Sequence, residues 1–188
     1  MSIYGNQTWT EQNKYMVART SKVKASDTGH IHDLVFETPI QQGMAVRAGD
    51  YLGDGLQLRK GTFAKKGEAI AFACDVPLIY EEYKTSDQFE FNYINKKGKP
   101  VKTYEIVKDD IFGVSDYGFS TIVDTSKGVK LNSYVVVDES GKYKELAAKP
   151  SADEYGFIGQ VMGFEKYQYD TVVLVTVLKN ADIAAPAA

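Results

Sequence analysis

The residues with the clearest chemical potential in this sequence are its two histidines, His30 and His32. They are two positions apart, so both would point to the same face of a strand. With Asp33 beside them, they could offer two imidazoles and a carboxylate to zinc or iron. The competing interpretation is a pair of histidines at a strand end, next to a turn at residues 27–29. We favour the structural interpretation, and we expect no metal site and no cofactor.

Two candidate nucleophiles, Ser115 and Cys74, lack the surroundings that catalysis requires. A nucleophile elbow needs a glycine two residues after the serine, and Tyr117 occupies that position. Cys74 closes the apolar run Ala69–Cys74, where a buried thiol acts as a small hydrophobic group. We therefore predict no catalytic residue, and a protein that is not an enzyme. As the single cysteine, Cys74 also excludes an internal disulfide.

The composition limits the classes of partner. The chain has 188 residues and a net charge of −3, which argues against nucleic acid as a partner. The longest apolar run, Val172–Leu178, is far shorter than the roughly 20 residues of a membrane helix. The first residues show no signal-peptide pattern, so we expect a soluble product with no membrane partner. The glycine-rich segment 49–55 fits neither a calcium loop nor a dinucleotide loop, and it is interpreted as a turn cluster. We expect no small-molecule substrate.

Two groups of residues are candidates for protein contacts. The densest basic patch comprises Lys96, Lys97, Lys99 and Lys102, and it is either a solvated loop tip or an electrostatic contact to an acidic protein surface. Aromatic residues near the start of the chain either fold back on the body or anchor into another subunit, because Trp and Tyr are favoured at binding hot spots. These aromatic residues are Tyr4, Trp9 and Tyr15.

The elements that must position these residues are β-strands. The 13 Tyr, 9 Phe and 16 Gly are typical of a β-rich protein, and no convincing amphipathic helix is present. The segment Phe89–Tyr93 alternates with period two and predicts a strand. A turn cluster at residues 95–100 and an extended run at Val101–Val107 complete a predicted hairpin with a basic tip.

Two further hairpins are predicted toward the end of the chain. One pairs Tyr134–Val137 with Tyr143–Leu146 around a turn whose Gly141 suits a left-handed conformation. The other pairs Gly156–Phe164 with Gln168–Leu178 around residues 165–167, and its second arm is apolar on both sides, as in a central strand. Other strands are expected at Ile31–Phe36, Met44–Leu52, Ala69–Asp75, Ile111–Val114 and Phe119–Val123.

Strand spacing and short turns predict an all-β fold, a compact antiparallel β-barrel or sandwich. Residues 1–14 are polar and aromatic without a period, which favours an extended N-terminal arm. Residues 15–180 are expected to form one β-rich domain, or two small β-units with a boundary near residues 85–110. Residues 181–188 include AAPAA and predict a short, frayed and flexible tail.

The order of turns and strands resembles that of capsid decoration proteins, also called cement or auxiliary head proteins, of tailed bacteriophages of Gram-positive hosts. The resemblance covers residues 40–180. Two departures exist, since the segment before His30 has no counterpart and residues 101–103 replace an Arg or small residue. The resembling segments are GMAVRAGDYLG, Pro77, Ile79–Glu82, Gly98–Pro100, Tyr104–Ile106, Asp110–Val114, GKYKELAA, YGFIGQVMGFE and DTVVLVTVLKN.

This resemblance implies a non-enzymatic virion structural protein, made in the host cytoplasm, that binds the outside of the viral head and stabilises the shell. Its implied partners are the major capsid protein and further copies of itself in a homo-oligomer. The rival hypothesis is a carbohydrate-binding β-sandwich module or phage adhesin domain, since the tyrosines could stack on sugars.

Overall fold

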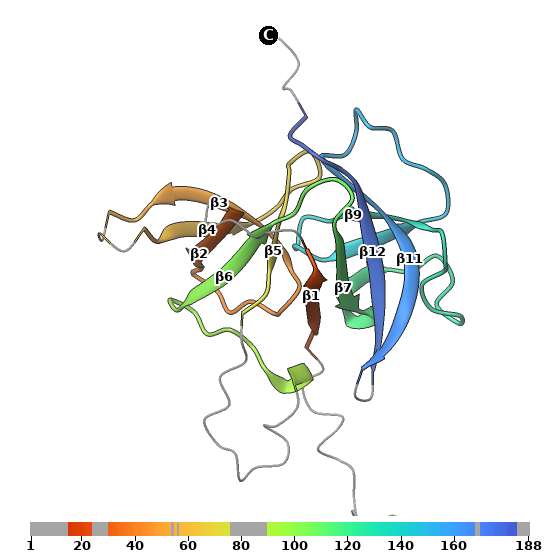
Figure 1. Cartoon of the computed structure of the whole chain (residues 1–188), viewed down its shortest axis with the longest axis horizontal. Coiled ribbons are helices and arrows are strands. Elements are labelled where there is room, and N and C mark those ends of the chain that lie inside the picture. Colours follow the sequence, from red (N-terminus) through yellow and green to blue (C-terminus); the bar gives the residue numbers. More distant parts are fainter. Residues whose placement is uncertain are drawn as a thin grey trace, which may run out of the picture.

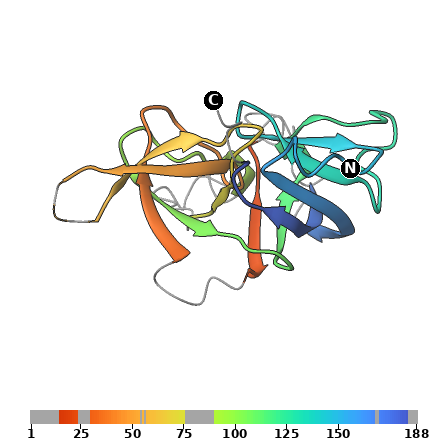
Figure 2. The same ribbon diagram turned by 90° about the horizontal axis from the view of Figure 1, so that it is seen from above.

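The computed structural model describes residues 15–23, 30–53, 55, 57–75, 90–167 and 170–183. Within these ranges, strands β1–β12 account for nearly all regular structure, with two short 3₁₀ helices. The strands form a closed barrel and a seven-stranded sheet, which lie side by side (Figures 1 and 2). The predicted all-β class is therefore confirmed. The pairing is mostly antiparallel, but β2 with β4 and β8 with β10 run parallel.

The barrel closes in the strand order β2-β4-β3-β5-β6. Its strands are short, and glycine and alanine at several inward positions leave space for a few large rings. At Gly61 an added Cβ would lie only 2.4 Å from the ring of Phe36, so that ring occupies the space a side chain would need. The strands are β2 (Ile31–Val35), β3 (Ala45–Tyr51), β4 (Arg59–Phe63), β5 (Ala71–Ala73) and β6 (Pro100–Glu105).

The sheet has the strand order β1-β7-β12-β11-β9-β10-β8, so β12 is a central strand as predicted. Val173, Val175 and Val177 of β12 are buried in the core. The strands are β1 (Ala18–Lys22), β7 (Ile111–Ser115), β8 (Phe119–Thr121), β9 (Tyr134–Val137), β10 (Tyr143–Leu146), β11 (Phe157–Tyr167) and β12 (Asp170–Asn180).

Both predicted C-terminal hairpins are present. The β9–β10 hairpin has the predicted strand bounds and places Gly141 at φ +75°, the left-handed region that glycine adopts without strain. The β11–β12 hairpin is longer than predicted, because Glu165 pairs with Val172 and Tyr167 with Asp170. Residues 165–167 are thus part of the strand and not the turn.

The predicted hairpin at residues 89–107 is wrong in its first arm. Glu90–Asn92 forms the 3₁₀ helix η4, and β6 pairs instead with β2 and β5. The period-two alternation at this position reflects a short turn that buries Phe91. Residue 89, at the start of the predicted strand, lies outside the described part. The basic turn itself is present, held by the hydrogen bond from the Gly98 N–H to the Phe36 carbonyl (2.9 Å).

Two strands and part of the C-terminus differ from the sequence prediction. Strands β1 and β4 were not predicted, since ARTSK and RKGTF are largely polar. The predicted tail is tied to the body at its start, where Ala181 N–H donates to Gly156 O (3.0 Å) and Ile183 N–H to Gly67 O (2.9 Å). Residues 184–188 and the predicted arm, residues 1–14, lie outside the described part.

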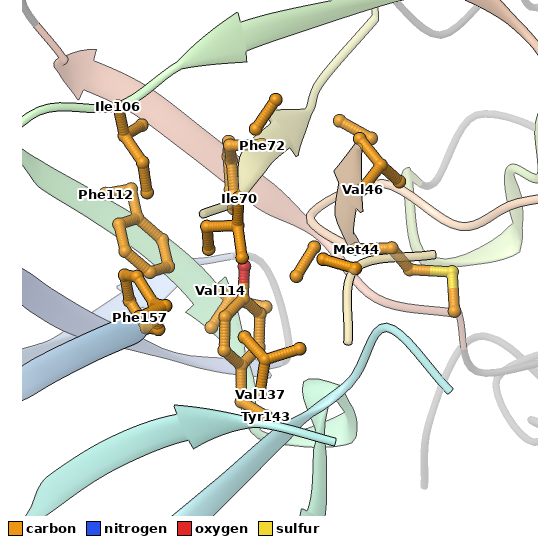
Figure 3. Packing of buried hydrophobic residues seen from close by; sticks show 14 of the residues in the cluster. Met44, Val46, Ile70, Phe72, Ile106, Phe112, Val114, Val137, Tyr143 and Phe157 are labelled. Atoms are coloured by element: carbon orange, nitrogen blue, oxygen red, sulfur yellow. The ribbon is translucent and has the colours of Figure 1, made fainter. Parts of the chain in front are cut away.

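Barrel and sheet share one continuous hydrophobic core (Figure 3). At its centre, the ring of Phe112 from β7 lies 4.9 Å from Phe72 of the barrel, 5.6 Å from Tyr143 and 6.0 Å from Phe157 (centroid distances). Such tilted aromatic pairs stabilise by about 0.5–1.5 kcal/mol each beyond area burial. The Tyr143 hydroxyl is buried here without a hydrogen-bond partner, and it points toward Ile70.

Candidate functional site

The two histidines meet a carboxylate that the sequence argument did not identify. His30 Nδ1 lies 3.3 Å and His32 Nε2 2.9 Å from the two carboxylate oxygens of Glu105 on β6. Asp33 is not part of this group, because it is the next residue on β2 and points to the other face. Within the described residues, no three His, Cys, Asp or Glu side chains form a metal-binding group. The histidines therefore connect the start of β2 to the end of β6.

A cleft of about 340 Å³ opens beside this cluster, where β3 and the segment 69–71 separate. Its floor is apolar, and its rim carries His30, Glu105, Arg59 and the ion pair of Arg47 with Asp182. Both Asp182 oxygens accept from Arg47 (2.5 and 2.9 Å), and Oδ1 also accepts from the Ala69 N–H (2.8 Å). These donors hold the pKa of Asp182 at about 2. Apolar floor and polar rim are typical of a small-ligand site.

The two candidate nucleophiles have structural surroundings. Burial raises the pKa of the Cys74 thiol to about 11, so at neutral pH it is protonated and a poor nucleophile. The Ser115 hydroxyl oxygen is buried and accepts the Val17 N–H (3.0 Å), which joins the start of the described chain to β7.

A second cleft, of about 420 Å³, lies beside β1. Arg19 of β1 stacks on the ring of Tyr167 at 3.5 Å, and the Tyr167 hydroxyl donates to Glu90 (2.8 Å). This chain of contacts ties β1, β11 and η4 together. Burial and the Glu90 hydrogen bond raise the pKa of Tyr167. Because these polar groups are satisfied by one another, we assign this cleft a structural role.

The predicted basic patch is a rigid exposed turn. Lys96, Lys97 and Lys99 are exposed, and none of them forms an ion pair with a residue that the structure describes. The turn is closed by two backbone hydrogen bonds, from Gly98 to Phe36 and from Lys99 to Lys96. It therefore presents positive charge that no described residue compensates, on a backbone held by these hydrogen bonds.

The three predicted aromatic anchors differ in what the structure says of them. Tyr4 and Trp9 lie outside the described residues, so their role stays a prediction. Tyr15 is half-buried, and its N–H donates to the Phe91 carbonyl (2.7 Å). This backbone contact places Tyr15 against η4, at the edge of the body.

Several large apolar side chains that were not singled out from the sequence are exposed in the structure. One pair, Tyr51 and Leu52, lies at the end of the β3–β4 hairpin, at the far left of Figure 1. Four others are Met162 and Phe164 of β11, and Val123 and Leu131 of the connection between β8 and β9. In the sequence these residues have the same pattern as core residues, so only the tertiary structure identifies them as exposed.

Comparisons with protein-family models, with curated proteins and with solved structures found no match to this chain. Among the described residues, no helix has the length and hydrophobicity needed to cross a membrane.

Proposed function

We propose that this chain is a non-enzymatic decoration protein that binds the outside of a tailed-bacteriophage capsid and stabilises the shell. Two features support this function. The sequence order of residues 40–180 resembles that of decoration proteins, and the basic turn at residues 96–99 lies inside that stretch. The turn is the observation that carries the proposal, because three lysines that form no ion pair with a described residue, on a hydrogen-bonded turn, suit an acidic protein surface.

A decoration protein can stabilise the shell through its binding energy alone. A protein that binds the assembled shell but not free capsid subunits stabilises the shell by mass action. At a free concentration of 100 times Kd, the gain is about 2.7 kcal/mol per site. The shared core of barrel and sheet provides the rigid body that such binding needs.

Co-sedimentation of the full chain with capsids that lack it tests the proposal. The charge reversal K96E/K97E/K99E should weaken capsid binding at least tenfold, and binding of the unchanged chain should fall as salt rises. The matched control is K108E/K144E/K149E, which reverses three other exposed lysines and should bind nearly as the unchanged chain does.

Two outcomes would contradict the proposal. If the unchanged chain does not sediment with capsids, the decoration role is wrong. If both triple variants bind equally well, the basic turn is not the docking surface.

The predicted arm is tested in the same assay. Deletion of residues 1–14 should leave the body folded and weaken capsid binding. Trp9→Ala alone should cost about 1–3 kcal/mol of binding if Trp9 is an anchor. A thermal melt of the deletion variant serves as the control, and loss of the folded body would place the arm in the core.

The rival function, carbohydrate binding, has one observation in its favour, the cleft beside Arg59, His30 and Glu105 with its apolar floor. Titration with host wall polysaccharide distinguishes the two functions. Under this alternative, saturable binding should appear and Arg59→Ala should reduce it, whereas a decoration protein should show neither effect.

A further inference from the structure

We propose that the end of the β3–β4 hairpin is the apolar half of the docking surface whose basic half is the lysine turn at residues 96–99. In this arrangement Tyr51 and Leu52 enter an apolar pocket on the partner, and the lysines contact acidic groups beside that pocket. The inference rests on the proposed function, under which the partner is the capsid. It adds the chemistry of the capsid surface, which is an apolar pocket with an acidic rim.

The apolar residues at the hairpin end are exposed, yet they are held in place. Tyr51 is 67% and Leu52 48% exposed. The Arg59 guanidinium carbon lies 5.1 Å from the centroid of the Tyr51 ring, and Arg59 Nε donates to the Gly49 carbonyl (2.8 Å). Across the hairpin, the Leu52 N–H donates to the Leu58 carbonyl (2.9 Å). Because side chains that are already ordered lose little conformational entropy on binding, this pair is suited to anchor a partner.

Strand pairing places the hairpin end on the same side of the barrel as the lysine turn. Tyr51 lies opposite Arg59 of β4, and Arg59 lies beside Leu34 of β2. Leu34 in turn lies opposite Val101 of β6, two residues after Lys99. Neighbouring strands are about 4.8 Å apart, so these steps separate Tyr51 from Val101 by roughly 15 Å. In Figure 1 the hairpin projects at the far left, and β6 begins on the same side, away from the sheet.

This separation fits within one interface, and the surface in between has no excess charge. A standard interface covers about 800 Å² on each partner, a patch roughly 30 Å across. Between the hairpin end and the turn, Lys60 pairs with Glu37 (3.4 Å), and Asp33 lies opposite Lys102. The lysine turn is therefore the basic part of this side of the barrel, and the hairpin end is its exposed apolar part.

A second copy of the chain is a poor match for this surface. In a two-fold contact, the lysine turn of one chain meets either the turn or the hairpin end of the other. The first arrangement brings like charges together. The second sets three lysines against Tyr51 and Leu52, where Asp50 is the one carboxylate among the described hairpin residues. Neither arrangement gives both halves of the surface a complementary partner.

An anionic membrane is also a poorer match than a protein. Lysines beside exposed apolar side chains would be attracted to such a membrane. However, Asp33, Glu37 and Asp50 are exposed on the same side of the barrel, and anionic headgroups would repel them. A protein surface can instead place a separate group opposite each charge and a pocket opposite the apolar pair. We therefore assign this surface to a protein partner that differs from this chain.

Co-sedimentation of the full chain with capsids that lack it tests the apolar half by itself. Tyr51→Ser/Leu52→Ser should weaken capsid binding at least tenfold, because both anchors are lost. The matched control is Met162→Ser/Phe164→Ser, which removes an exposed apolar pair from the sheet and should bind as the unchanged chain does. Leu52→Ser alone leaves the contact between Tyr51 and Arg59 in place and should show a smaller loss in the same direction. Thermal melts should show that all three variants are folded.

Salt dependence separates the two halves of the surface. Contacts of exposed lysines weaken as salt rises, whereas burial of apolar side chains does not. Tyr51→Ser/Leu52→Ser should therefore lower the affinity by the same factor at every salt concentration. K96E/K97E/K99E should instead remove most of the salt dependence.

The outcomes distinguish this inference from the proposed function. If the unchanged chain binds capsids and Tyr51→Ser/Leu52→Ser binds equally well, this inference alone is overturned, and equal weakening by the control has the same meaning. Absence of any capsid binding overturns the proposed function and this inference with it. Sedimentation with phosphatidylserine vesicles and sedimentation equilibrium of the chain alone test the other occupants. Vesicle binding or self-association that Tyr51→Ser/Leu52→Ser removes would overturn the assignment to a different protein.

Discussion

The barrel and the sheet differ in whether their strands have unpaired edges. The barrel closes its five strands on themselves, so every strand has a neighbour on both sides. Its strands offer no unpaired backbone edge, so its contacts with other molecules involve side chains and turns, such as the lysine turn and the Tyr51 hairpin end. The sheet stays open, and half of β11 has no outer partner among the described residues. The open sheet can therefore offer backbone groups as well as side chains to a partner.

The two regions also contribute different side chains to the shared core. The sheet contributes large side chains on long strands, as at Phe112, Phe157 and the valines of β12. The barrel packs small residues closely, and Phe36 fills the space above Gly61. This difference indicates that a buried charge should lower the free energy of unfolding most when it is placed in the sheet. Added side-chain volume should lower it most when it is placed in the barrel. The following predictions test that contrast.

The largest effect is expected from Val175→Asp, which places an unpaired charge in central β12. It should lower the free energy of unfolding by at least about 3 kcal/mol, measured by urea denaturation. Thr171→Asp on the same strand is the control, because Thr171 is exposed, and it should change stability by less than about 0.5 kcal/mol. Equal stability of the two variants would contradict a central position for β12.

The barrel is tested by Gly61→Ala. The new methyl group would overlap the Phe36 ring, so the free energy of unfolding should fall by about 1–3 kcal/mol. The same substitution in the sheet, Gly163→Ala, has free space and should cost under about 1 kcal/mol. A double-mutant cycle with Phe36→Leu should recover part of the loss. Additive effects would show that the two sites are independent.

A smaller effect of opposite sign is expected from Tyr143→Phe at the boundary between barrel and sheet. Removing a buried hydroxyl that has no partner in the structure should leave stability unchanged or raise it by about 1 kcal/mol. Thermal melts of the two proteins measure this. A loss of more than about 1 kcal/mol would mean that the hydroxyl has a hydrogen-bond partner in solution.

The smallest effect concerns the Arg47–Asp182 pair, which attaches the end of β12 to the barrel. The pKa of Asp182 is lowered to about 2, so the pair stabilises the fold above the ordinary carboxyl pKa, and this stabilisation is lost as pH falls from about 4 to about 2. Because Asp182 is half exposed, the effect should be below about 1 kcal/mol.

Thermal melts of Asp182→Asn and the unchanged chain check this prediction. The unchanged chain should be the more stable protein at pH 5, and the difference should disappear near pH 2. A difference that persists at low pH would assign the stabilisation to another contact.

The sequence by itself determined the elements whose residues are locally self-consistent. The apolar run of β12 identified a central strand, because a strand buried on both faces needs apolar residues at every position. The β9–β10 hairpin followed from its turn, since Gly141 adopts a backbone conformation that few other residues tolerate. The basic turn at residues 96–99 was predicted from the cluster of turn residues at 95–100.

Only the tertiary structure decided the rest. Strand β4 contains Gly61 and charged residues, and it is a strand because β2 and β3 supply hydrogen bonds on both sides. Glu90–Asn92 has strand-like alternation and forms a 3₁₀ turn. The partner of His30 and His32 is Glu105, far along the chain, and the exposure of Met162 and Phe164 depends on where β9 ends. These features depend on contacts between distant segments, which local sequence patterns do not specify.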